Sequence, residues 1–205
     1  MEPTPPRPHR LFVAISPPDP VRRRLAALVA DLKRSAGRAG GDVRWIPPEN
    51  VHLTLQFLGA VPDERVEDVK AAVSAAAATA AGALSLEVRG AGGFPNARRP
   101  RIVWLGLGGD VAALAAIVAD LGRRLAPLGF PPEARPFSPH LTVGRARDQR
   151  GAPGLGGALA HAAEAEGVPW RAAELVLVES FLSPKGPRYE PILHAALGAG
   201  AAAHP

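Results

Sequence analysis

The chain has 205 residues, enough to bury a hydrophobic core in one large domain or two small lobes. It contains no cysteine, which excludes a disulfide framework and is compatible with a reducing cytoplasm. The formal net charge of +5 suits a polyanionic partner, but the arginine-, alanine- and proline-rich composition of a GC-rich genome explains it equally well. No apolar run reaches the length of a membrane span, and the first ten residues lack the hydrophobic segment of a secretory signal.

The first half of the chain predicts alternating strands and helices, separated by proline pairs and glycine clusters. Four β-prone stretches are expected to be strands: residues 11–16, 43–46, 51–58 and 84–89. Aliphatic residues at helical spacing and a run of alanines predict helices at residues 19–36 and 62–81. Residues 90–99 are expected to form a loop that carries Phe94, and residues 1–9 a disordered leader, unless His9 begins the first strand.

The second half repeats this order of elements. Four further stretches are expected to be strands: residues 102–107, 139–145, 175–182 and 189–197. A helix capped by Asp110 is expected at residues 111–125, and another at about 155–166. Residues 127–136 should form a long loop, residues 183–188 a turn, and residues 198–205 a disordered tail.

One short pattern occurs twice, as His52-Leu53-Thr54-Leu55 and as His140-Leu141-Thr142-Val143. Because side chains alternate between the two faces of a strand, each copy places an imidazole and a hydroxyl on one face and two aliphatic side chains on the other. A single histidine on a strand is more often a packed or surface residue. Two copies of the pattern in a chain with only six histidines favour a functional site.

Two imidazoles that face each other can supply a general base and a general acid, because both titrate near neutral pH. Two threonine hydroxyls add neutral donors for anionic oxygens, so the set suits a phosphodiester substrate. A zinc site fits poorly, since threonine is not a usual ligand and neither copy has a second histidine or carboxylate at ligand spacing. A serine or cysteine nucleophile is not indicated, because the chain has no Gly-x-Ser-x-Gly motif and no cysteine.

The repeated order of elements predicts an internal duplication. The first strands of the two halves begin at residues 11 and 102, which are 91 positions apart, and the motif histidines at residues 52 and 140 are 88 positions apart. Two α+β lobes related by a pseudo-twofold axis would bring equivalent strands to a shared cleft. We therefore expect His52 to lie across that cleft from His140.

The two motifs resemble the signature of the two-histidine (2H) phosphoesterase superfamily. Further stretches resemble its LigT-like branch, the bacterial and archaeal RNA 2',3'-cyclic phosphodiesterases once described as 2'-5' RNA ligases. These stretches are residues 10–15, 49–59, 93–95, 99–104, 139–145 and 186–189. The resemblance implies an α+β fold with two antiparallel sheets facing a central groove and helices outside. It covers one domain at residues 10–197, with lobes at about 10–92 and 100–197.

The resemblance also implies roles for residues. His52 would protonate the leaving 3'-oxygen, His140 would activate water, and Thr54 and Thr142 would bind the nonbridging oxygens. Three further residues are candidates for substrate binding: Arg145, Tyr189 and Phe57.

The sequence leaves the placement of these three candidates open. Arg145 follows Thr142 by three positions and would point to the opposite face of a regular strand, unless a bulge at Gly144 turns it into the groove. Tyr189 would stack on a base or bind a phosphate. Phenylalanines such as Phe57, Phe94 and Phe181 are more often core residues. The remaining histidines, His161, His194 and His204, are expected to be structural or at the surface.

The function implied is hydrolysis of 2',3'-cyclic phosphate ends of RNA to 2'-phosphates, without a metal or another cofactor. RNA ends or small cyclic nucleotides would be the partners of a cytoplasmic monomer. Two alternatives remain open. The protein could join cyclic-phosphate and 5'-hydroxyl ends as a 2'-5' RNA ligase, or it could be a binding module without catalysis, although the intact motifs argue against the latter.

Overall fold

The computed structural model describes residues 8–184 and 186–199, so most of the two tails predicted to be disordered lie outside the described part. His9 is the first residue of strand β1, and its ring lies 2.9 Å from Glu179 Oε1 and 3.1 Å from Asp63 Oδ1. Hydrogen bonds to Asp63 and Glu179 raise the pKa of His9. This contact fixes the start of β1 against β8. No helix in residues 8–184 and 186–199 is long and apolar enough to cross a membrane.

Strands and helices alternate along most of the described chain. The strands are β1 His9–Ile15, β2 Val43–Trp45, β3 Leu53–Val61, β4 Leu84–Phe94, β5 Ile102–Gly109, β6 His140–Ala146, β7 Val168–Ala172, β8 Glu174–Ser183 and β9 Gly186–Ala196. The α-helices are α1 Asp19–Ala36, α2 Val66–Ala78, α3 Val111–Leu125 and α4 Gly156–Ala163. Short 3-10 helices are η1 Gly37–Asp42, η2 Pro48–Asn50, η3 Asp63–Arg65 and η4 Ala126–Leu128.

All of the strand pairs are antiparallel, in the order β7-β4-β5-β6-β3-β1-β8-β9, with β2 paired to β6 beside β3. The two motif strands, β3 and β6, lie at the middle of this order. They meet at one residue pair among the described residues, Leu53 with Leu141. The predicted α+β fold with antiparallel strands is therefore confirmed. The two sheets that were expected are continuous with each other through this pair and form one nine-stranded sheet.

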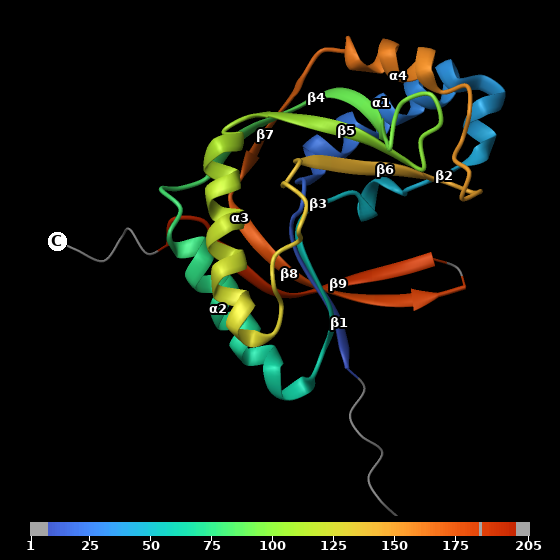
Figure 1. Ribbon diagram of the computed structural model, residues 1–205. Helices are drawn as coiled ribbons and strands as arrows, with labels where there is room; N and C mark the ends of the chain where they lie inside the picture. The colour runs from blue at the N-terminus through green and yellow to red at the C-terminus, as the bar shows by residue number, and fades with distance from the viewer. Residues whose placement is uncertain (1–7, 185, 200–205) are drawn as a thin grey trace, which may run out of the picture.

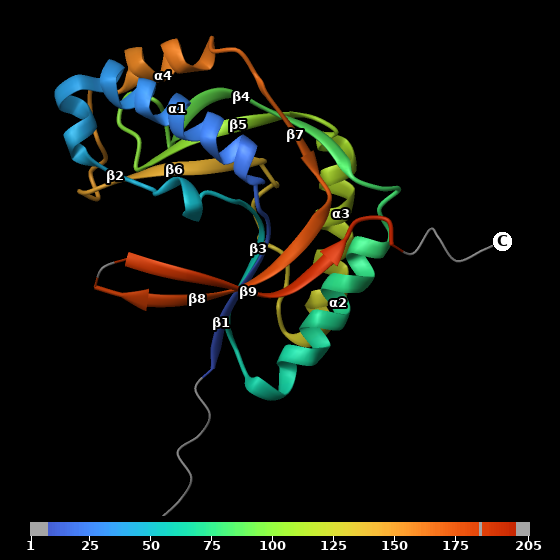
Figure 2. The same cartoon turned by 180° about the vertical axis from the view of Figure 1, so that it is seen from behind.

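The helices pair across the two halves of the sequence (Figures 1 and 2). Helices α1 and α4 contact each other, with α1 against β7 and α4 against β4. Helices α2 and α3 also contact each other, with α2 against β8 and β9 and α3 against β3 and β4. Each pair thus combines one helix from each half of the chain. The division into lobes at residues 10–92 and 100–197 stays a prediction, since strands of both segments contribute to each half of the sheet.

The main core lies on the helix side of the sheet. In β1, the alternating side chains Leu11, Val13 and Ile15 are buried in this core, while Phe12 and Ala14 point to the other face. There they pack with Val176, Val178 and Tyr189 in a smaller cluster. The face that carries Phe12 is therefore the face available for a site.

Two elements differ from the sequence expectation. The predicted loop at residues 90–99 is wrong in its first part, because β4 continues to Phe94. Gly90 adopts a φ of +77° at a break in register between Val88 and Ala91, and this bulge lets the strand continue. Strand β7 is absent from the sequence expectation. It contains Pro169 and lies at the edge of the sheet, where a proline is tolerated.

The expected cap of the third helix is also different. Asp110 occupies the N-cap position of α3, but its side chain makes no capping hydrogen bond to that helix. Its Oδ2 instead accepts a hydrogen bond of 2.8 Å from the backbone N–H of Ser85. Asp110 therefore links the start of α3 to β4.

Candidate active site

The two His-x-Thr motifs meet on one face of the sheet. His52 lies directly before β3, and His140 is the first residue of β6. Because Leu53 pairs with Leu141 in antiparallel register, continuing the register by one residue places His52 opposite Thr142 and Thr54 opposite His140. Cβ atoms of directly opposite residues are typically about 4.5–5.5 Å apart and those of diagonal residues about 7–8 Å. By this register the two imidazoles are diagonal neighbours on one face of the sheet.

Both imidazoles are oriented by the same local hydrogen bond. His52 Nδ1 lies 2.8 Å from the carbonyl oxygen of Asn50, and His140 Nδ1 lies 2.7 Å from that of Ser138. A carbonyl oxygen can only accept, so Nδ1 carries the proton in each ring. Nε2 is then left to take up or release a proton, which is the requirement for general acid–base chemistry.

Aromatic side chains pack around both imidazoles. The ring of His52 stacks on Phe12 at 4.8 Å between centroids and meets Tyr189 edge-on at 5.2 Å. On the other side, His140 meets Phe94 edge-on at 5.1 Å, and Trp104 lies 6.4 Å away. These contacts hold each ring in place while the hydrogen bond at Nδ1 sets its rotation.

A bulge turns Arg145 toward the motif face. Thr142 pairs with Trp104 and Arg145 with Ile102, so Val143 is an additional residue in β6. Trp104 and Ile102 are two positions apart on β5 and share a face, so Thr142 and Arg145 share a face as well. Both Val143 and Gly144 are buried, so the alternation of buried and exposed residues along β6 is interrupted at this point. The bulge considered near Gly144 is therefore present, at Val143, and Arg145 does not point to the face opposite Thr142.

The first motif strand has an equivalent bulge. Thr54 pairs with Ala14 and Gln56 with Val13, so Leu55 is the additional residue of β3. Phe57 consequently occupies the position that Arg145 occupies in β6, three residues after the motif threonine. Its side chain is 55 % exposed, so the view of Phe57 as a core residue is wrong. At equivalent positions, one side of the site thus presents a ring and the other a guanidinium.

This asymmetry changes the electrostatics of His52. Burial lowers the pKa of His52, the hydrogen bond to the Asn50 carbonyl partly restores it, and the positive charge of Arg145 lowers it further. Burial also raises the pKa of Tyr189, against the opposing effect of Arg145 and Arg10. Arg145 therefore acts electrostatically on both groups, which places its charge beside the first motif.

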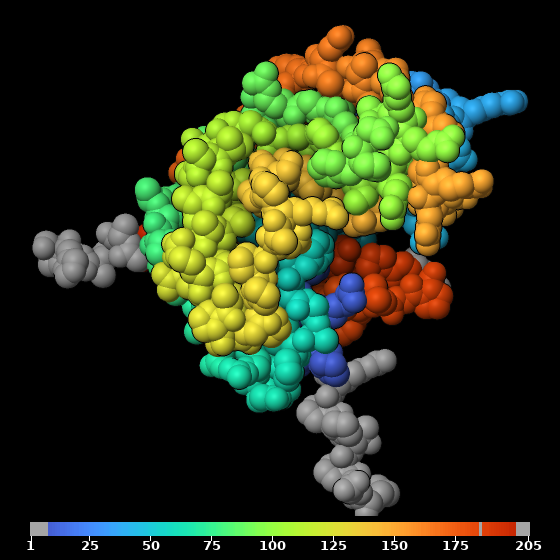
Figure 3. Space-filling model, viewed as in Figure 1, coloured from blue at the N-terminus to red at the C-terminus, as the bar shows by residue number. Residues whose placement is uncertain are grey.

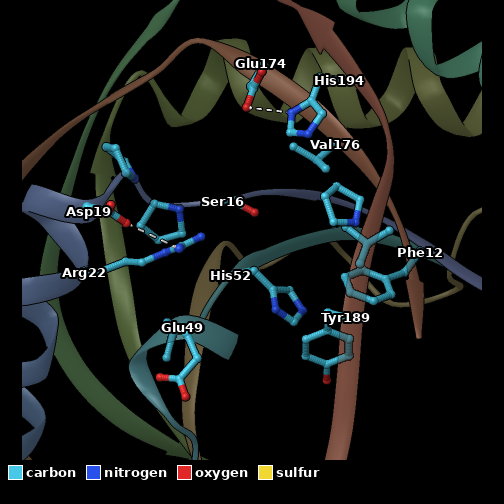
Figure 4. Close-up of a pocket in the computed structure, with 15 residues that line it drawn as sticks. Phe12, Ser16, Asp19, Arg22, Glu49, His52, Glu174, Val176, Tyr189 and His194 are labelled. Atoms are coloured by element: carbon cyan, nitrogen blue, oxygen red, sulfur yellow. Dashed lines mark hydrogen bonds and ion pairs between the residues drawn. The ribbon is translucent and has the colours of Figure 1, made fainter. Parts of the chain in front are cut away.

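A groove of about 440 Å³ extends from His52 between the start of α1 and strands β8 and β9. Figure 4 shows His52 and Tyr189 at one end and the Glu174–His194 and Asp19–Arg22 pairs toward the other. Phe12, Val176 and Val178 give it an apolar floor. On the molecular surface, the β8–β9 hairpin is separated from the β5–β6 half by a recess (Figure 3). The volume and lining suit a nucleoside.

The structure brings together six of the seven candidate residues around this face, namely the two histidines, the two threonines, Arg145 and Tyr189. Phe57 lies farther along β3, and the centroid of its ring is 5.9 Å from that of Phe12. Sequence reasoning missed the rings of Phe12 and Trp104, and it favoured a core position for Phe94. The alternation of residues 11–15 could have placed Phe12 beside the motif strand, but nothing local indicated which face the other two rings would occupy.

The fold and the site are those of a phosphoesterase of the two-histidine type, with one histidine–threonine motif at each of two equivalent strands. The sequence profile described as LigT like Phosphoesterase matches residues 15–104 and 109–189, and each segment contains one motif. The chain belongs to this family.

Individual relatives agree with this assignment. An RNA 2',3'-cyclic phosphodiesterase from Aeropyrum pernix is 33 % identical over 162 residues, which cover 79 % of this chain and 90 % of the relative. A crystal structure from Thermus thermophilus has a TM-score of 0.73 at 29 % identity, covering 92 % of this chain and 98 % of that one. E. coli LigT in complex with 3'-AMP has a TM-score of 0.67 at 26 % identity, covering 93 % and 98 %.

Proposed function

We propose that this protein is a hydrolase that opens 2',3'-cyclic phosphate ends of RNA to 2'-phosphates. The observation that carries the proposal is the Leu53–Leu141 pair, which sets two histidines and two threonines on one face of the sheet. The name shared by several relatives and the 3'-AMP complex of E. coli LigT support a ribonucleotide substrate.

In the proposed reaction, His140 Nε2 accepts a proton from water while the water oxygen attacks phosphorus. His52, protonated on both ring nitrogens, donates the proton on Nε2 to the 3'-oxygen as the bond between phosphorus and that oxygen breaks. The product carries a free 3'-hydroxyl and a 2'-phosphate. Thr54, Thr142 and Arg145 offset the negative charge that develops on the nonbridging oxygens.

The terminal nucleoside fits the groove beside His52. Its base would lie against the apolar floor of β1 and β8, and Tyr189 would contact the base or the phosphate. Phe57 offers a second exposed ring along the strand. RNA ends and small cyclic nucleotides are both possible substrates in this arrangement. Since all of the proposed catalytic groups come from one chain, a monomer is sufficient, and we propose that it acts in the cytoplasm.

The proposal is tested with 2',3'-cyclic AMP and with an oligoribonucleotide that ends in a 2',3'-cyclic phosphate. Phosphorus NMR should show conversion of each substrate to its 2'-phosphate, at a rate that a chelator does not change. A parallel reaction with a 5'-hydroxyl RNA detects ligation. A 3'-phosphate product, strict dependence on added metal, or tight binding without turnover would contradict the proposal.

The threonine hydroxyls give a separate prediction. Thr54→Val and Thr142→Val keep the β-branched shape that suits a strand but remove the donor, so kcat/KM should fall about 10²-fold for each. Thr54→Ser and Thr142→Ser retain the hydroxyl and serve as matched controls. Steady-state kinetics and thermal melts should show that the valine variants lose activity while their Tm stays near that of the parent. Full activity of both valine variants would exclude the role.

A further inference from the structure

Two arginines lie directly opposite each other beside the candidate active site. Strand β2 pairs with β6 in antiparallel register, and Arg44 pairs with Arg145 between the pairs Val43–Ala146 and Trp45–Gly144. Both arginines are exposed. Like charges at directly opposite positions of a sheet are unfavourable, so this pair requires a physical reason.

The register determines where Arg44 points. Residues that pair directly in antiparallel strands carry their side chains on the same face, so Arg44 shares the face of Arg145 and hence of Thr142. Val43 and Trp45 point the other way, and a Cβ on Gly144 would lie 2.6 Å from Val43 Cγ1. This close packing fixes β2 on β6, so Arg44 is held on a rigid element.

The two charges are not neutralised within the described part of the chain. No carboxylate among residues 8–184 and 186–199 forms an ion pair within 4.0 Å with Arg44 or Arg145. Other surface arginines, such as Arg123 and Arg124, do have an acidic partner, Asp120. An unneutralised pair of guanidinium groups on one face favours an anionic ligand with more than one charge.

The proposed function places the reacting phosphate beside Arg145, whose charge acts on His52. Arg44 lies on β2, one cross-strand step from the strand that carries the second motif. An RNA strand has its next phosphate one nucleotide away from the cyclic end, whereas a cyclic mononucleotide has no second phosphate. The position of Arg44 therefore matches a feature that only the longer substrate possesses.

We propose that Arg44 binds the backbone phosphate next to the cyclic end, and that it gives the enzyme a preference for oligonucleotides over mononucleotides. This inference rests on the proposed function and adds a binding residue to it. Arg145 holds the reacting phosphate, Arg44 holds its neighbour, and β2 sets the spacing between the two.

The test compares Arg44→Gln with the parent protein on 2',3'-cyclic AMP and on a short RNA with a 2',3'-cyclic end. The ratio of kcat/KM for the RNA to kcat/KM for the mononucleotide should fall about tenfold, since one charge-assisted contact is lost. For RNA, the slope of log affinity against log salt should fall by about 0.7, the value for one phosphate of a single strand. Arg44→Lys should restore part of both effects, and Arg23→Gln at an exposed position of α1 is the control.

Binding of the 2'-phosphate products, measured by calorimetry on the same variants, separates this inference from the proposed function. If no substrate is hydrolysed, the proposed function is contradicted. Binding of the product RNA to the parent and to Arg44→Gln still shows whether Arg44 contacts the RNA. An equal fall in kcat/KM for RNA and for the mononucleotide would show that Arg44 acts on the reacting phosphate. That result would overturn the inference. An unchanged ratio and an unchanged salt slope would overturn it as well.

Discussion

Replacement of His52 or His140 by alanine should lower kcat/KM for a 2',3'-cyclic phosphate by about 10²–10⁴-fold, the usual contribution of one general acid or base. The double variant should lose little more than the worse single variant, because the two groups act in one concerted step. Each ring donates a hydrogen bond only to a nearby carbonyl and lies outside the main core, so its removal leaves that core intact.

The control for this pair is His161→Ala on α4, since His161 is exposed and lies outside the site. Circular dichroism and thermal melts of all four variants establish that they are folded. Loss of activity in His161→Ala, or substantial turnover in both single variants, would contradict the two-histidine mechanism. Phosphorus NMR of the residual reaction would also show whether the product remains the 2'-phosphate.

Replacement of Arg145 by glutamine should lower kcat/KM by about 10²-fold and move one limb of its pH profile. Burial and the Arg145 charge both lower the pKa of His52, so removing that charge raises this pKa. If His52 is the general acid, it must be protonated to act, and activity is lost as the pH rises through its pKa. The alkaline limb of the profile should then move to higher pH in Arg145→Gln.

Arg145→Lys is the matched control, because it retains a positive charge and should leave that limb close to its original position. NMR titration of His52 in the same proteins reports the change in pKa directly. Movement of the acidic limb instead would show that His52 is the base and His140 the acid. If the pKa of His52 did not rise in Arg145→Gln, the electrostatic contact itself would be refuted.

The local sequence pattern predicted much of the candidate site. The alternation of each motif placed histidine and threonine on one face, and the duplication indicated that the two faces would meet, as the Leu53–Leu141 pair shows. The class of the fold followed from the same alternation of strands and helices. These features depend on neighbours along the chain, because period 2 and period 3.6 are properties of the local backbone.

Bulges and cross-strand partners could not be derived in this way. The direction of Arg145 depends on an additional residue in β6, and the pairing of Arg44 with Arg145 depends on where β2 joins the sheet. The rings of Phe94 and Trp104 reach His140 from strands that are remote from it in sequence. A bulge changes the face of a side chain without a distinctive local sequence, since it arises from hydrogen bonding between strands.

The sequence by itself therefore determined which groups could perform acid–base chemistry and that two copies of them exist. Only the tertiary structure decided how the copies differ. It placed Arg145 beside His52 and left Phe57 at the equivalent position of the other strand. The physical reason is that composition and periodicity set what each strand presents, whereas the electrostatic environment of a histidine is set by residues that long-range pairing brings to it.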